Sequence, residues 1–207
     1  MAKGKYVFVM DSDDWAMPER LEAQIDALEY IPNLLACGCT HEDFNNIICY
    51  RTLQYSGLKV NLLLNNSFLH PSLAIRKDIL HQINYYNEKY VYASDYDLAC
   101  RLSLCGKVIN LPDILMKYRA HENRISSLHS KQQTAYADGI RINYLHACGF
   151  VLNKQQESIF TGFMKNPYIL NAIEIQELKD ELHKQNSELK YFKSEYLDSL
   201  FDSSTYE

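Results

Sequence analysis

The sequence predicts an α/β domain with a mixed, mostly parallel sheet and flanking helices, followed by a C-terminal helical extension. Short apolar runs rich in β-forming residues alternate with helical patterns over residues 1–130. Residues 131–170 carry a helical pattern with few breakers, and apolar residues recur every seven positions within residues 171–207. We therefore divide the chain at these bounds.

Composition and charge narrow the class of protein. The chain has 207 residues, of which 47% are hydrophobic and 23% charged, which suits a soluble domain with a sizeable core. The net charge of -5 and the scattered Lys and Arg argue against nucleic-acid binding. No apolar run reaches the roughly 20 residues that a membrane helix needs.

The six cysteines form no C-x-x-C pair, which argues against a zinc ribbon or a thioredoxin-like site. Cys37 and Cys39 lie in an apolar run, where strand geometry puts both on one face. We expect buried, reduced thiols and a cytoplasmic location.

The first predicted elements are a strand at residues 6–10 and a helix that Pro18 opens and Pro32 ends. The apolar positions of this helix recur at i, i+4 and i+7: Leu21, Ile25 and Leu28. Five further runs read as strands: residues 34–39, 45–51, 70–76, 108–111 and 114–119. Two runs read as helices: residues 77–83 and 95–105. We expect Pro112 to separate the last two strands.

Residues 172–200 are predicted to form one long amphipathic helix. Its seven-residue seam consists of Ile175, Leu182, Leu189 and Tyr196, and Leu178 and Phe192 occupy the companion position. The pattern leaves open whether this helix packs within the chain or joins two copies of the chain in a homodimer.

Three carboxylates, those of Asp11, Asp13 and Asp14, come directly after the first apolar strand. In open α/β sheets, ligands bind beyond the carboxyl ends of strands. Carboxylates crowded together repel each other unless a cation neutralises them, and hard oxygen ligands suit Mg²⁺ or Mn²⁺. A solvated acidic turn that caps the following helix explains the local pattern equally well.

The segment GKYVFVMDSDD (residues 4–14), followed by PERL (residues 18–21), resembles the metal-binding segment of family 2 glycosyltransferases. The resemblance covers roughly residues 3–130 and implies a partial GT-A fold. It implies that Asp11 contacts the nucleotide ribose and that Asp13 binds the divalent ion on the diphosphate, with Asp14 in support.

The segment SDYDL (residues 94–98) resembles the family element in which an Asp at a helix start is the catalytic base. Asp95 matches that Asp, and Ser94 replaces the usual Glu beside the acceptor. A general base takes the proton of the attacking hydroxyl. The alternative is that Ser94 or Asp95 only caps the helix. Asp97 and Arg101, one turn apart, are expected to form a structural ion pair.

Residues 118–126 (YRAHENRIS) resemble a third family segment, whose His reaches the diphosphate or its metal. The resemblance implies this role for His121, and Arg124 becomes a candidate phosphate contact. The segment that starts at His70 resembles one beside the acceptor, so His70 is a candidate acceptor contact. An ordinary surface, core or loop role is the alternative for both histidines.

Together, these resemblances imply a metal-dependent, inverting enzyme that moves a sugar from a nucleotide-diphosphate donor to a saccharide or lipid-linked acceptor. Kinship implies surface polysaccharide synthesis and peripheral association with the inner face of a membrane. The opening strand and the base-reading Asp of relatives are expected to lie outside this chain. Two alternatives stay open. One is a truncated, inactive relative that acts as an interaction module. The other is a haloacid-dehalogenase-like phosphotransferase, although that class has Gly-Thr or Gly-Val after its second Asp, where this chain has Asp14 and Trp15.

Overall fold

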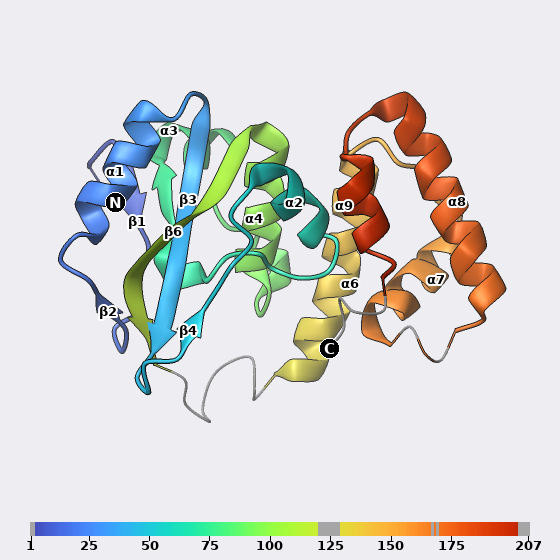
Figure 1. Cartoon of the computed structure of the whole chain (residues 1–207), viewed down its shortest axis with the longest axis horizontal. Coiled ribbons are helices and arrows are strands. Elements are labelled where there is room, and N and C mark those ends of the chain that lie inside the picture. The colour runs from blue at the N-terminus through green and yellow to red at the C-terminus, as the bar shows by residue number, and fades with distance from the viewer. Residues whose placement is uncertain (1–2, 120–128, 167, 169, 203–207) are drawn as a thin grey trace.

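The computed structural model describes residues 3–119, 129–166, 168 and 170–202, in which a mixed sheet packs between helices (Figure 1). The strands are β1 (Tyr6–Phe8), β2 (Trp15–Ala16), β3 (Leu34–Asp43), β4 (Ile48–Cys49), β5 (Ala74–Arg76) and β6 (Lys107–Tyr118). The α-helices are α1 (Arg20–Tyr30), α2 (Tyr55–Asn61), α3 (Lys77–Gln82), α4 (Ser94–Cys105), α6 (Ser130–Ala147), α7 (Lys154–Lys165), α8 (Ala172–Leu189) and α9 (Ser194–Ser199). Two 3₁₀ turns are η1 (His70–Ser72) and η2 (Glu88–Tyr90).

The predicted mixed α/β fold is confirmed, but its strands pair differently from the expectation. The order is β1-β5-β3-β6-β2, with β4 beside β3. Among the described strands, β3 and β6 form the one parallel pair, and the other pairs are antiparallel. A parallel pair needs a helical crossover, and α2, α3 and α4 provide one between β3 and β6. Helix α2 also lies between β3 and β5, yet β5 returns antiparallel to β3, so the expectation of a mostly parallel sheet was wrong here.

Pro112 does not end a strand, contrary to prediction. Strand β6 runs through it, and the pairing with β3 jumps from Leu111 to Ile114 at an irregularity in the register. Pro112 and Asp113 are exposed at that point. A bulge tolerates proline because its residues do not donate to the ladder.

Two apolar cores lie on the two faces of the sheet. The smaller core joins α1 to one face and includes Leu28, Cys37 and Cys39. The larger core joins the other face to α4, α6, α8 and α9. The helices of the C-terminal extension therefore share a core with the sheet, and Figure 1 shows α7, α8 and α9 gathered at the end of the molecule away from β1.

Helix α1 buries a different face from the predicted one. Leu21 is 55% exposed, whereas Arg20 and Gln24 are buried with Leu28. The reason is hydrogen bonding: the two polar side chains reach backbone carbonyls of neighbouring segments.

The cysteines are free thiols, and Cys37 and Cys39 share one core as predicted. Cys105 is exposed, so the expectation of burial fails there. It lies at the end of α4, beside Gly106.

The predicted single helix over residues 172–200 is broken. Helix α8 ends at Leu189, and Lys190 adopts a left-handed conformation with a φ of 51° before α9 begins. Leu178, Leu182 and Phe192 are buried in the larger core. Of the seam itself, Leu182 packs fully within the chain, whereas Leu189 is 41% exposed. No described helix has the length and apolar character needed to cross a membrane.

Candidate active site

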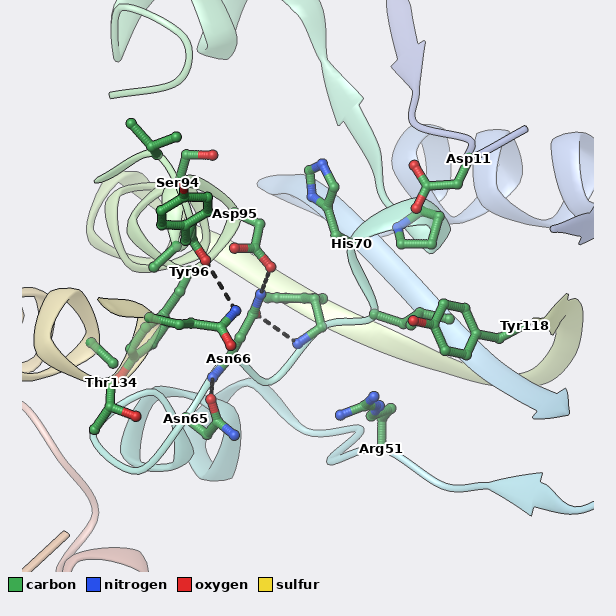
Figure 2. A pocket seen from close by; sticks show the side chains of 18 of the residues that line it. Asp11, Arg51, Asn65, Asn66, His70, Ser94, Asp95, Tyr96, Tyr118 and Thr134 are labelled. Atoms are coloured by element: carbon green, nitrogen blue, oxygen red, sulfur yellow. Dashed lines mark hydrogen bonds between the residues drawn. The ribbon is translucent and has the colours of Figure 1, made fainter. Parts of the chain in front are cut away.

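The candidate site is a pocket of about 1180 Å³ in which segments far apart in the sequence converge (Figure 2). We call Asp11, Asp13 and His70 the strand wall, and Gln133, Thr134, Met164 and Lys165 the helix wall. The remaining lining residues come from the loops between these walls and from α4 and α6: Arg51, Asn65, Asn66, Phe68, Leu69, Pro71, Val91, Tyr92, Ala93, Ser94, Asp95, Tyr96, Tyr118, Arg119, Ala137 and Arg141.

The acidic turn after β1 divides its carboxylates between two tasks. Asp11 and Asp13 line the pocket, whereas Asp14 is not among the lining residues. One Asp14 oxygen accepts a hydrogen bond of 2.8 Å from the backbone N–H of Arg119, and the Arg119 Nε donates to the Asp13 carbonyl oxygen at 3.1 Å. Burial raises the pKa of Asp14, and the Arg119 N–H opposes that shift. Asp14 therefore fastens the end of β6 to the turn.

Arg20 positions the strand wall from behind. Its guanidinium donates to the carbonyl oxygens of Val9 and Pro71, both at 2.8 Å, so it ties the end of β1 to η1. Gln24 continues this bridge with bonds to the carbonyl oxygens of Ser72 and Cys37. Because buried carbonyls need partners, these bonds fix Asp11 relative to His70.

His70 lies between two of the predicted carboxylates, as Figure 2 shows. Burial lowers its pKa, and the negative charges of Asp95 and Asp11 oppose that shift. Its Nε2 is 3.3 Å from the Tyr86 hydroxyl, whose ring meets the imidazole edge-on. Because the effect of burial exceeds that of the two carboxylates, the imidazole that contacts the pocket is neutral.

Asp95 stands at the start of α4 and faces the pocket. The Asn66 amide donates to one of its oxygens at 2.9 Å (Figure 2). Helix α4 has Ala93 as its N-cap and no side-chain capping bond, so the capping alternative for Ser94 and Asp95 is not met. Sequence reasoning missed Asn66, because residues 57–66 carry no clear periodic signal.

The predicted pair of Asp97 and Arg101 is confirmed as structural. The Arg101 Nε is 2.7 Å from an Asp97 oxygen, and its other nitrogens donate to the carbonyl oxygens of Ile83 and Tyr85. The guanidinium thereby fastens the loop after α3 to the helix that carries Asp95.

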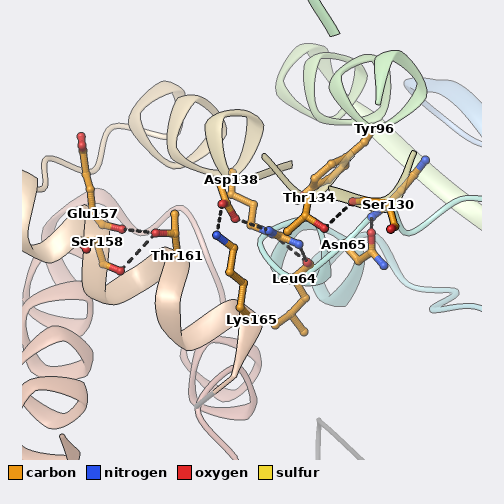
Figure 3. Close-up of polar contacts among 12 residues, drawn as sticks. Leu64, Asn65, Tyr96, Ser130, Thr134, Asp138, Glu157, Ser158, Thr161 and Lys165 are labelled. Carbon is orange, nitrogen blue, oxygen red and sulfur yellow. Dashed lines mark hydrogen bonds and ion pairs between the residues drawn. The ribbon is translucent and has the colours of Figure 1, made fainter. Parts of the chain in front are cut away.

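The helix wall comes from the part of the chain that we assigned to an extension. Asp138 of α6 pairs with Lys165 of α7 and with Arg141, whose guanidinium also donates to the Leu64 carbonyl oxygen (Figure 3). These contacts hold α6 and α7 against the loop that contains Asn66. Helices α6 and α7 therefore help to shape the pocket, which sequence periodicity alone did not indicate.

The fit to a divalent cation rests on the acidic turn. The described residues contain no group of three or more His, Cys, Asp or Glu side chains arranged to hold a metal ion. Mg²⁺ and Mn²⁺ bound with a nucleotide need only one or two carboxylates, since substrate phosphates and water complete the shell. Asp11 and Asp13 offer such oxygens to the pocket. The predicted metal ligand His121 and phosphate contact Arg124 lie outside the described residues.

Comparison with known proteins points to one family of enzymes. The model of glycosyl transferase family 2 matches residues 1–96. The amylovoran biosynthesis glycosyltransferase AmsE of Erwinia amylovora is 33% identical over 122 residues, which cover 56% of this chain and 46% of that protein. The O-antigen biosynthesis glycosyltransferase WbnJ of Escherichia coli is 31% identical over 58% of this chain and 50% of its own length. An uncharacterized glycosyltransferase of Haemophilus influenzae is 28% identical over 67% and 47%, respectively. The chain spans about half the length of these relatives.

Proposed function

Because this chain belongs to the family 2 glycosyltransferases, we propose that it forms the metal-binding and acceptor-binding part of an enzyme of polysaccharide synthesis. One observation carries the proposal: Asp11, Asp13 and Asp95, which are far apart in the sequence, line one pocket. The reaction transfers a sugar from a nucleotide-diphosphate donor to a hydroxyl of a saccharide or lipid-linked acceptor.

The donor binds at the strand wall. Asp11 contacts the nucleotide ribose, and Asp13 holds Mg²⁺ or Mn²⁺, with Asp14 and Arg20 keeping the turn in place. When bound, the ion neutralises negative charge on the diphosphate leaving group. Arg124 and His121 are proposed to add contacts to the diphosphate or its metal.

Asp95 acts as the general base. The acceptor oxygen attacks the anomeric carbon as the bond from that carbon to the donor phosphate oxygen breaks, and the hydroxyl proton passes to Asp95. Attack from the face opposite the leaving group inverts the anomeric configuration. A positioned base contributes typically ~10²–10⁴-fold to the rate, and the Asn66 amide fixes the orientation of the carboxylate.

The acceptor lies between His70, Ser94 and the helix wall. A neutral His70 accepts or donates one hydrogen bond without adding charge beside Asp95. Thr134 and Gln133 offer further polar groups from α6. Variation in α6 and α7 would then change acceptor choice while the chemistry stays the same.

The test is transfer or donor hydrolysis with a panel of nucleotide sugars and Mn²⁺, comparing the native chain with Asp13→Ala and Asp95→Asn. We expect both variants to lose turnover, and Asp13→Ala also to bind nucleotide more weakly. Asp180→Asn, on the exposed face of α8, serves as the control. Native turnover in either site variant would remove that residue from the mechanism.

An interaction module without activity is the second candidate function. Absence of turnover with every donor, despite metal-dependent nucleotide binding, would favour it. Hydrolysis of simple phosphate esters without a sugar nucleotide would instead favour the phosphotransferase alternative.

A further inference from the structure

Arg51 lines the pocket but has no role in the mechanism above. It follows β4, and Figure 2 shows it near Tyr118 and apart from Asp11, His70 and Asp95. Its charge interacts with Cys49 and Tyr118 rather than with any of the pocket carboxylates. The negative side chains of the pocket act instead on His70.

The guanidinium of Arg51 is partly buried and has no partner among the described residues. Its Nε atom is inaccessible to solvent and has no hydrogen-bond partner, and the part of the chain that the structure describes supplies it with neither a hydrogen bond nor an ion pair. Burial lowers the pKa of this group, yet arginine stays charged in proteins. A buried, unpaired charge is costly, so folded proteins normally pair it.

The described groups whose charges interact with Arg51 are Cys49, Tyr118 and His41 rather than a carboxylate. Burial and the Arg51 charge together lower the pKa of His41 to about 4, and Asp43 opposes that shift, so this imidazole is neutral. The other cation near Tyr118, Arg119, already contacts the Asp13 carbonyl oxygen and lies 4.0 Å from the centre of the Phe44 ring. Among the described residues, the positive charge of Arg51 therefore has no anionic partner at this end of the pocket.

We propose that Arg51 is the binding residue for an oxyanion of a substrate, a phosphate or a carboxylate. The planar guanidinium matches both groups in a bidentate geometry. The oxyanion belongs either to the diphosphate of the donor or to an anionic acceptor, such as a uronic acid or a phosphate-linked saccharide. The assignment to a substrate rests on the proposed function, whereas binding of an oxyanion does not.

The test measures calorimetric binding of uridine diphosphate and of glucuronate to the native chain, Arg51→Gln and Arg51→Lys. We expect Arg51→Gln to weaken one probe at least about tenfold, and Arg51→Lys to weaken it less. Loss confined to uridine diphosphate assigns the oxyanion to the donor, and loss confined to glucuronate assigns it to the acceptor. Lys154→Gln, whose side chain is 93% exposed, should bind both probes like the native chain.

Thermal unfolding distinguishes a binding role of Arg51 from a purely structural one. Because Arg51 lacks a partner among the described residues, Arg51→Gln should unfold at the native temperature or above it. A lower unfolding temperature, native affinity for both probes, or no binding of either probe to the native chain would each overturn the proposal. Native affinity in Arg51→Gln together with lost turnover in Asp13→Ala would leave the proposed function standing.

Discussion

The strand wall and the helix wall of the pocket are held in place by different forces. Behind the strand wall, the Arg20 guanidinium, 2% exposed, bonds to two backbone carbonyls from separate segments. Behind the helix wall, buried Arg141 of α6 also bonds to a backbone carbonyl, that of Leu64. Helix α7, however, is joined to α6 by the pair of Asp138 with Lys165, whose side chain is 46% exposed. Buried hydrogen bonds to charged groups are worth more than ion pairs that water and salt screen. The comparison teaches that the proposed donor side is rigidly positioned, whereas the acceptor side is open to adjustment.

The largest effect is expected from Arg20→Met. It leaves the buried carbonyls of Val9 and Pro71 without their donor, so the free energy of unfolding should fall by about 3–5 kcal/mol. Denaturant unfolding measures the change, with the exposed Lys131→Met as the control. A loss below about 1 kcal/mol would mean that the strand wall is not held from behind by Arg20.

His41→Phe tests, through pH, the stability of β3, the strand that pairs with β5 and β6 behind the pocket. His41 is 3% exposed, and burial lowers its pKa from 6.5 to about 4. The unfolded chain takes up the proton below its pKa of 6.5 before the folded chain does, so folding stability falls as pH drops from there to about 4. The loss is at most about 3 kcal/mol and should be absent in the variant.

Unfolding free energies at several pH values measure this difference, and exposed His81→Phe is the matched control. If the unfolding free energies of the native chain and of His41→Phe fall equally as the pH drops, burial does not shift the titration of His41 in the folded chain.

Asn66→Ala tests the junction of the two walls. It removes the hydrogen bond to Asp95, so the turnover of the proposed transfer should fall about tenfold, about 1.4 kcal/mol, with a smaller change in KM. The exposed Asn45→Ala, which lies outside the pocket lining, is the control. A rise in KM of about tenfold with unchanged kcat would instead assign Asn66 to acceptor binding.

The smallest effect is expected from Lys165→Ala. Its ion pair with Asp138 is partly exposed, so the free energy of unfolding should change by about 0.5 kcal/mol or less, and less still at high salt. Asp138→Asn should cost more, because it also weakens the pair with Arg141, 10% exposed. Equal losses for Lys165→Ala and Arg20→Met would end the distinction between the walls.

Much of the strand wall could be predicted from local sequence. An apolar run followed by Asp11, Asp13 and Asp14 predicted carboxylates beyond a strand end, and Asp11 and Asp13 line the pocket there. Asp97 and Arg101 were readable as a pair because helical spacing alone brings them together.

The errors fall where long-range contacts outweigh local preference. Pro112 reads as a strand end, but a bulge against β3 accommodates it. The apolar Leu21 reads as core, but the carbonyls that Arg20 and Gln24 satisfy decide which face of α1 is buried. The seam of residues 172–200 reads as one helix, but α9 turns back after Lys190 so that Phe192 and Leu197 enter the larger core.

By itself, the sequence determined the α/β class, the acidic turn, a helix that starts near Asp95 and the kinship with glycosyltransferases, because each follows from neighbouring residues. Only the tertiary structure decided that Asn66 orients Asp95, that α6 and α7 line the pocket, and that the Arg51 Nε lies there without a partner among the described residues. These features depend on which distant segments meet, and side-chain periodicity along one segment does not specify its partner.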